Sequence, residues 1–147
     1  MKQQSILLVE DNEDDVELTL MAFERARITN PVVVTRDGVD ALEYLLCEGK
    51  YAERDLRDQP LVVLLDLKLP RIGGLEVLQR VRANERTKTI PVVILTTSTE
   101  YEDLIQAGDF HANSYVRKPV DFDAFVEAAR QLGLYWTVLN QPIPASI

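Results

Sequence analysis

Three short apolar runs, each ending in charged residues, decide the fold: Ile6-Leu7-Leu8-Val9 before Glu10-Asp11, Leu61-Val62-Val63-Leu64-Leu65 before Asp66, and Ser114-Tyr115-Val116-Arg117 before Lys118-Pro119. Such runs are typical of buried parallel strands. Open α/β sheets place their binding sites at the carboxyl ends of these strands. If the three strands are neighbours, three carboxylates and one ammonium group converge. That composition indicates a magnesium and phosphoryl site.

Strand and helix alternate along the chain. Apolar spacing and turn residues predict strands at about 5–9, 32–34, 61–66, 92–95 and 115–117. Helices are predicted at about 12–27, from Asp37-Gly38 to Gly49, and at 75–83, 101–107 and 121–132. With right-handed crossovers, five such units give an α/β fold with a doubly wound, five-stranded parallel sheet. The polar residues 50–59 are expected to form an exposed loop.

Size and composition bound the class of protein. A chain of 147 residues fits one domain, which we place at residues 1–132, with 133–147 as a short apolar C-terminal extension. The net charge of -8, without a Lys/Arg cluster, argues against direct binding of nucleic acid or of a membrane surface. Cys47, the single cysteine, is expected to be a packing residue in a helix. These features predict a cytoplasmic protein.

Glu10, Asp11 and Asp66 are the candidate metal ligands. Glu10 and Asp11 are adjacent where the first predicted strand meets the first predicted helix. Carboxylates this close repel each other, and a divalent cation removes the cost of that repulsion. Mg²⁺ prefers hard oxygen ligands, so Asp11 and Asp66 could each supply one oxygen and the backbone carbonyl near Lys68 a third. The alternative is that Asp11, Asn12 and Glu13 only cap the following helix and complement its dipole.

Asp66 is the candidate nucleophile, because its carboxylate could attack phosphorus while a cation offsets the charge on the phosphoryl oxygens. A structural aspartate that caps a turn is the alternative. Pro119 biases Lys118 toward an extended backbone, from which the ammonium group could reach a phosphoryl oxygen. The hydroxyl of Thr96 could bond to the same group. Separately, each of the latter two residues is more often an ordinary surface or strand-end residue.

With these residues the chain resembles the receiver domain of two-component response regulators, over roughly residues 6–132. The resemblance covers the following motifs: Leu7-Leu8-Val9-Glu10-Asp11-Asn12, Leu64-Leu65-Asp66-Leu67-Lys68-Leu69-Pro70 with Gly73-Gly74, Pro91-Val92-Val93-Ile94-Leu95-Thr96, and Tyr115-Val116-Arg117-Lys118-Pro119. It implies a flavodoxin-like fold, Mg²⁺ as cofactor and a sensor histidine kinase as phosphoryl donor.

The resemblance also assigns roles to individual residues. Asp66 matches the phosphoacceptor, Asp11 a direct metal ligand, and Glu10 a ligand acting through water. Three further matches are the switch hydroxyl Thr96, the switch aromatic Tyr115 and the phosphate-binding Lys118. We therefore expect a phosphorylation switch whose output surface is built by residues 101–107, 115–117 and the helix from 121, rather than a turnover enzyme.

A narrower resemblance concerns the single-domain regulators paired with cyanobacterial phytochromes. It depends on the long loop at 50–59, on Leu95-Thr96-Thr97-Ser98 and on the aromatic pair Tyr135-Trp136. It implies a phytochrome-type kinase and a homodimer. The residues expected to contact a partner or a second subunit are Phe122, Leu134, Tyr135 and Trp136.

Two alternative functions stay open. One is a phosphohydrolase of the haloacid-dehalogenase type that uses Asp66 as nucleophile. Such enzymes need a second aspartate two residues later, where this chain has Lys68. The other is a pseudo-receiver, a protein-interaction module that never accepts phosphate. The complete set of acidic residues argues against the second alternative.

Overall fold

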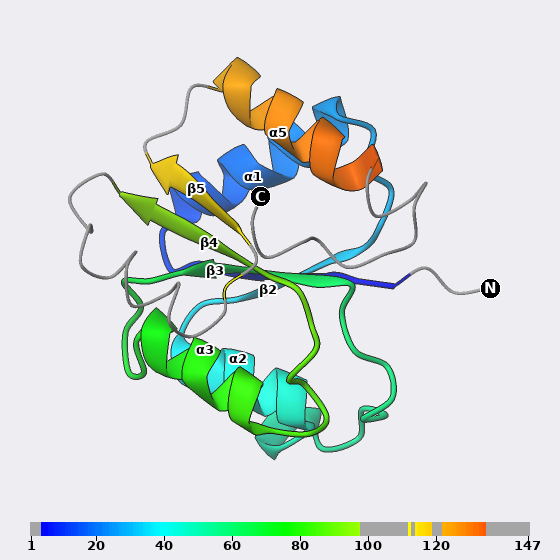
Figure 1. Cartoon of the computed structure of the whole chain (residues 1–147), viewed down its shortest axis with the longest axis vertical. Coiled ribbons are helices and arrows are strands. Elements are labelled where there is room, and N and C mark those ends of the chain that lie inside the picture. The colour runs from blue at the N-terminus through cyan, green and yellow to red at the C-terminus, as the bar shows by residue number, and fades with distance from the viewer. Residues whose placement is uncertain (1–3, 98–111, 113, 119–121, 135–147) are drawn as a thin grey trace.

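A parallel sheet with strand order β2-β1-β3-β4-β5 forms the centre of the molecule (Figure 1). The computed structural model describes residues 4–97, 112, 114–118 and 122–134. The strands are β1 (Ile6–Val9), β2 (Val32–Thr35), β3 (Val62–Asp66), β4 (Val92–Thr97) and β5 (Ser114–Lys118). Because β1 pairs with both β2 and β3, the strand order reverses beside β1. This arrangement confirms the predicted parallel α/β fold.

Helices cover both faces of the sheet (Figure 1). On one face lie α1 (Glu13–Arg25) and α5 (Phe122–Leu134); on the other lie α2 (Gly38–Leu46), the short 3₁₀ helix η1 (Gly49–Tyr51) and α3 (Gly74–Ala83). α5 runs two residues past its predicted end. The helix predicted at 101–107 and most of the predicted C-terminal extension lie outside the described residues. No helix in the described part of the chain has the length and apolar content to cross a membrane.

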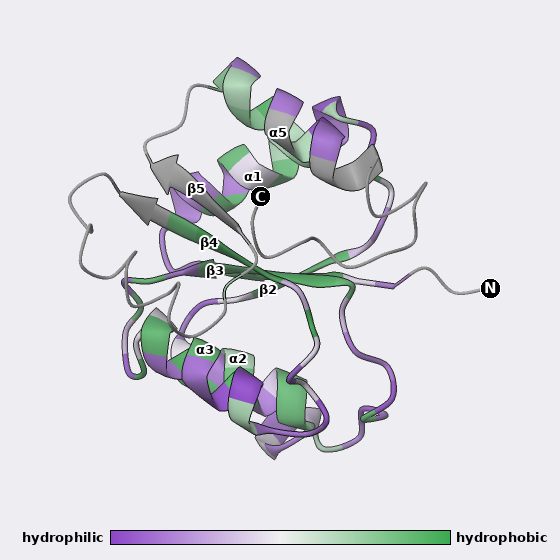
Figure 2. Ribbon diagram, in the orientation of Figure 1, coloured by the Kyte–Doolittle hydropathy of each residue, from purple (hydrophilic) through white to green (hydrophobic). Residues whose placement is uncertain are grey.

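The apolar runs are continuous because their strands are buried on both sides. All four residues of β1 are fully buried. Leu7 and Val9 pack in the core beneath α2 and α3, whereas Ile6 and Leu8 pack against α1 and α5. The hydrophobic colouring of β3 and of the lower part of β4 in Figure 2 follows this core. A rigid sheet of this kind fixes the residues at its carboxyl edge.

The start of α1 is set by Asn12. Its side-chain oxygen accepts a hydrogen bond of 3.1 Å from the backbone N–H of Asp15, as an N-cap residue does. Three acidic residues then fill the first turn, where the helix dipole favours negative charge. The helix ends at Arg25, two residues before its predicted end.

The end of α2 differs from the prediction. Gly49 was expected to end the helix, but α2 ends at Leu46 because Cys47 takes a left-handed backbone conformation with φ 56°. Gly49 instead begins η1. Cys47 was predicted to lie within a helix. It is instead the half-buried residue that caps the end of α2. At the other end, the side chain of Asp37 caps α2 by accepting from the N–H of Asp40 at 2.7 Å.

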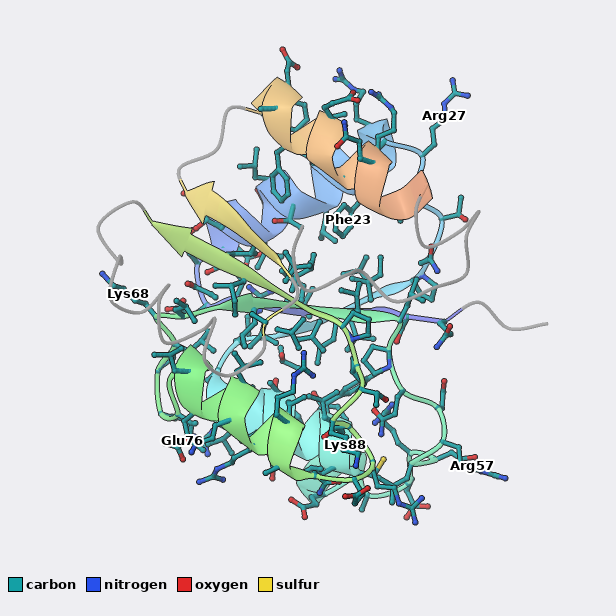
Figure 3. The ribbon with its side chains drawn as sticks, viewed as in Figure 1. Phe23, Arg27, Arg57, Lys68, Glu76 and Lys88 are labelled. Carbon is teal, nitrogen blue, oxygen red and sulfur yellow. The ribbon has the colours of Figure 1, made fainter. Side chains whose placement is uncertain are left out.

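Residues 50–59 are mostly exposed, as their charges predict, but the loop is held in place. The guanidinium of Arg54 lies 3.7 Å from the ring centroid of Tyr44 and donates to the carbonyls of Tyr44 and Asp58. Gln59 donates to the carbonyl of Leu45 at 3.0 Å. The segment is therefore tied to α2 by interactions with carbonyl groups at the end of that helix. Arg57, by contrast, extends away from the molecule (Figure 3).

Candidate functional site

Three carboxylates meet at the carboxyl edge of the sheet. Val9 of β1 pairs with Leu65 of β3, so the residues that follow them, Glu10 and Asp66, are neighbours at that edge. One carboxylate oxygen from each of Glu10, Asp11 and Asp66 can be chosen so that all three lie within 4.8 Å of one another. The structure thus brings together the three acidic residues that the strand ends predict.

The three acidic residues differ in burial. Glu10 is 1% exposed and Asp66 is 7% exposed, whereas Asp11 is exposed. The backbone N–H of Glu10 donates to the carbonyl of Thr35 at 3.0 Å, which fixes the chain just after β1. Oε2 of Glu10 accepts from the N–H of Asn12 at 3.3 Å. The capping alternative is confirmed for Asn12, which caps α1, and for Glu13, which lies in its first turn. It does not explain why the buried Glu10 lies beside Asp66.

Asp66 is held by the backbone of the loop that follows it. Oδ1 of Asp66 accepts from the N–H of Lys68 at 3.2 Å, so the chain turns back on the carboxylate. The Lys68 side chain is exposed and points away from the body of the molecule (Figure 3). Its charge is therefore directed outward, and its predicted contribution to a metal site is limited to the backbone carbonyl.

Gly74 allows α3 to begin directly against Asp66. Its N–H donates to the carbonyl of Leu67 at 2.9 Å. A Cβ atom at this position would lie 2.3 Å from the carbonyl oxygen of Asp66, a separation that forces the backbone to move. In the sequence, Gly73-Gly74 is only part of the motif shared with receiver domains. This contact explains why the second glycine is needed.

For Thr96, Tyr115 and Lys118, the other predicted site residues, the structure gives the position of the backbone in the sheet. Thr96 pairs with Arg117 and Thr97 with Lys118, so Lys118 lies at the carboxyl end of β5. β4 extends to Thr97, one residue past Thr96. Tyr115 lies within β5, opposite Ile94. The side chains of Thr96, Tyr115 and Lys118 lie outside the described part of the structure.

The residues predicted at a partner surface are only partly described. Phe122 begins α5 and is half-buried, with the guanidinium of Arg25 5.6 Å from its ring centroid. Leu134 is the last residue of α5. Tyr135 and Trp136 lie outside the described residues.

The acidic site fits a hard divalent cation. Its donors are carboxylate oxygens, which Mg²⁺ and Mn²⁺ accept as ligands. Two of the donors are almost completely buried, and a cation would offset the repulsion between them. An exposed acid beside the buried pair leaves a side of the site open to water, which Mg²⁺ usually retains in its coordination shell.

Residues 6–130 match the family model described as the response regulator receiver domain. This chain belongs to that family. The receiver is 43% identical over 141 residues to the probable methanogenesis regulatory protein FilR2 of Methanothrix harundinacea, a match that covers 95% of this chain and 88% of that protein. It is 34% identical to the response regulator Rcp1 of Synechocystis, over 89% of this chain and 87% of that protein.

Similar solved structures belong to the same family and include response regulators of phytochromes. The receiver superposes on the bacteriophytochrome response regulator RtBRR with a TM-score of 0.80 and 50% identity, covering 98% of this chain and 86% of that one. It superposes on the Mn²⁺-bound form of Rcp1 with a TM-score of 0.79 and 33% identity, covering 90% and 94%. Close neighbours of this receiver are therefore single-domain phytochrome response regulators.

Proposed function

We propose that this receiver is a phosphorylation switch in which Asp66 accepts a phosphoryl group from a sensor histidine kinase. The observation that carries the proposal is the gathering of oxygens from Glu10, Asp11 and Asp66 within 4.8 Å of one another. Mg²⁺ would be held by Asp11 and Asp66, by Glu10 through water, and by the backbone carbonyl of Lys68. The Mn²⁺-bound form of Rcp1 supports a divalent cation in a related receiver.

The transfer forms one bond and breaks one. A carboxylate oxygen of Asp66 attacks the phosphorus of a phosphohistidine, the P–N bond breaks, and its electron pair goes to the departing imidazole nitrogen. Lys118 and Thr96 bind the oxygens of the resulting aspartyl phosphate. The bound cation would offset negative charge on those oxygens. Because the outcome is a modified protein, we propose a signalling switch with self-catalysed chemistry, not a turnover enzyme.

The output of the switch is a change of surface. A phosphoryl group adds about -1.5 to -2 charges. We propose that Thr96 moves toward it, that Tyr115 follows, and that the surface formed by residues 101–107, β5 and α5 is thereby altered. A homodimer through this surface, with Phe122, Leu134, Tyr135 and Trp136 at the contact, is part of the proposal. Sedimentation that shows only monomer at tens of micromolar would contradict the dimer.

The proposed donor is a phytochrome-type histidine kinase in the cytoplasm. This rests on the similarity to RtBRR and Rcp1, whereas the name of FilR2 points to a different signalling context. Transfer of labelled phosphate from a bacteriophytochrome kinase to Asp66 is the expected result. If acetyl phosphate labels Asp66 but the phytochrome kinase does not, the pairing is wrong and the receiver function stands.

Incubation with acetyl phosphate and Mg²⁺ tests the receiver function itself. Intact-mass measurement should show one added phosphoryl group on the wild type and none on Asp66→Asn. Asp14→Asn is the matched control, because Asp14 is an exposed acid in the first turn of α1 that lies outside the three-carboxylate group. A wild type that stays unlabelled would favour the pseudo-receiver. Continuous hydrolysis without stable labelling would favour the phosphohydrolase.

A further inference from the structure

The start of α2 is packed directly against the loop of residues 67–73 that follows Asp66. A Cβ atom at Gly38 would lie 2.0 Å from the carbonyl oxygen of Ile72 and 2.8 Å from its carbonyl carbon. The N–H of Gly38 also points to the carbonyl of Pro70, at 3.5 Å. Glycine is therefore the residue that lets the helix approach the loop this closely.

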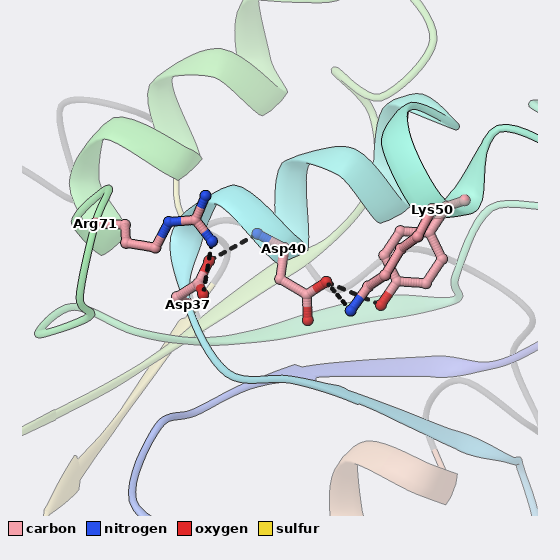
Figure 4. Close-up of polar contacts among 5 residues, drawn as sticks. Asp37, Asp40, Lys50 and Arg71 are labelled. Atoms are coloured by element: carbon pink, nitrogen blue, oxygen red, sulfur yellow. Dashed lines mark hydrogen bonds and ion pairs between the residues drawn. The ribbon is translucent and has the colours of Figure 1, made fainter.

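A second contact joins the same two segments. Oδ1 of Asp37 caps α2, and its Oδ2 lies 3.4 Å from a guanidinium nitrogen of Arg71 (Figure 4). Arg71 has a left-handed backbone, with φ 69°. One side chain thus serves as helix cap and as ion-pair partner of the loop. The loop is supported in its middle, at residues 70–72, by the first turn of α2.

The near end of the loop belongs to the acidic site. The N–H of Lys68 donates to the Asp66 carboxylate, and the N–H of Gly74 donates to the carbonyl of Leu67. A displacement of the loop at residues 70–72 would therefore shift the backbone at residues 67 and 68, which lies in the same short loop. That backbone holds the Asp66 carboxylate and carries the carbonyl of Lys68.

We propose that Gly38 is a positioning residue for the divalent-cation site. It acts through the loop backbone at residues 70–72 and at 67 and 68, and the ion pair between Asp37 and Arg71 is a second support. This inference rests on the proposed function, because it requires Asp66 and the Lys68 carbonyl to bind a cation. It assigns to the first turn of α2 a role that needs no direct contact with the cation.

The substitution Gly38→Ala distinguishes an effect on the cation site from an effect on the stability of α2. Alanine favours a helix over glycine, so the substitution by itself strengthens α2. The methyl group nevertheless requires the Ile72 carbonyl to move, and backbone yields less readily than the end of a flexible side chain. The expected effect is a loss of cation affinity in a chain that still folds.

Calorimetric titration of the full chain with Mg²⁺, and separately with Mn²⁺, tests the inference. Gly38→Ala should bind each cation about tenfold more weakly than the wild type, as changes to residues that orient metal ligands do. The matched control is Gly73→Ala in the same loop. Its Cβ atom would meet only the carbonyl oxygen of Leu67, at an ordinary 3.9 Å, so its affinity should stay within about twofold.

Urea denaturation of the same variants distinguishes positioning from stability. A merely structural role would lower the unfolding midpoint and leave the cation affinity of the folded protein unchanged. A folded Gly38→Ala that binds both cations as tightly as the wild type would overturn the inference and leave the proposed function intact. A wild type that binds neither cation would overturn both.

If Gly38→Ala does not fold, Arg71→Asn provides the test. Asparagine tolerates the left-handed backbone, and the change removes the guanidinium that contacts Asp37. Because Arg71 is exposed, the expected loss of cation affinity is smaller, about two- to fivefold. Unchanged affinity in this variant would overturn the inference in that case.

Discussion

Glu10 and Asp66, which follow paired residues of β1 and β3, bring carboxylate oxygens within 4.8 Å of each other while both side chains are almost completely buried. Two negative charges at this separation repel each other, and burial strengthens the repulsion. A bound cation offsets that cost only in the folded state, because the unfolded chain does not hold the two groups together. Cation binding and folding are therefore linked at this site.

Mg²⁺ should accordingly stabilise the protein against unfolding. At a free concentration of one hundred times the dissociation constant, the expected gain is about 2.7 kcal/mol. Thermal unfolding measured with Mg²⁺ and with EDTA checks this. Asp11→Asn should lose most of the gain, whereas the control Asp14→Asn should keep it. A melting temperature that does not respond to Mg²⁺ in the wild type would argue against the metal site.

Arg54 should contribute to stability although it lies in a highly charged segment. Its guanidinium stacks on Tyr44 and donates to two backbone carbonyls. We expect Arg54→Ala to lower the free energy of unfolding by about 1–3 kcal/mol. Arg57→Ala is the control, since the Arg57 side chain is 85% exposed and pairs with Asp55 in its own segment. Equal effects of the two substitutions in urea denaturation would count against the described role of Arg54.

Gly74→Ala should destabilise the protein even though alanine favours helices. The added Cβ atom would lie 2.3 Å from the carbonyl oxygen of Asp66 and 2.6 Å from Cα of Leu67. Forcing these backbone atoms apart should cost about 1–3 kcal/mol, as overpacking typically does. Urea denaturation beside Gly73→Ala provides the comparison, because that methyl group has room and the variant should lose only the preference for glycine at the N-cap of α3, about 0.5 kcal/mol. Similar midpoints for the two variants would refute the close contact.

The hydroxyl of Tyr51 should ionise at a higher pH than an ordinary tyrosine. Partial burial raises the pKa of Tyr51, and its hydrogen bond to Oδ1 of Asp40, at 3.0 Å, raises it further. The same oxygen lies 3.1 Å from Nζ of Lys50, whose pKa is raised by that bond (Figure 4). The stability that Tyr51 gains from this shift is present below about pH 10 and is lost as the pH rises through its folded pKa.

Spectrophotometric titration of tyrosine ionisation tests that expectation. The difference between the wild type and Tyr51→Phe isolates the curve of Tyr51. Asp40→Asn should move this curve to lower pH, because it removes the negative charge that favours the protonated phenol, although the amide oxygen can still accept a hydrogen bond. A Tyr51 that titrates at or below the ordinary value near 10 would contradict the described contacts.

Those features that follow from local pattern could be predicted from the sequence. The apolar runs before Glu10 and Asp66 predict buried strands, and the rule for carboxyl ends then places the two acids together. The end of α2 was missed because Cys47 adopts a left-handed backbone that sequence patterns assign to glycine. The fixed position of residues 50–59 was missed because it depends on Arg54 meeting Tyr44, and charge alone predicts exposure.

The role of Gly38 was also beyond sequence reasoning. Asp37-Gly38 predicts a turn into a helix, and the cap by Asp37 agrees with that signal. The need for glycine comes instead from Ile72, which belongs to a different strand–helix unit. Close approaches between distant segments leave no periodic trace in either segment. They become visible only when the backbone atoms of both are placed.

The pairing of β1 with β3 has a consequence for the newly made chain. Glu10 leaves the ribosome early and Asp66 much later, with the whole second strand–helix unit between them. A nascent chain that stops before β3 therefore has two of the three acidic residues, Glu10 and Asp11, and lacks Asp66 and the strand that carries it. The complete cation site can form only after β1 has paired with β3, so binding of the cation would report that this pairing has taken place.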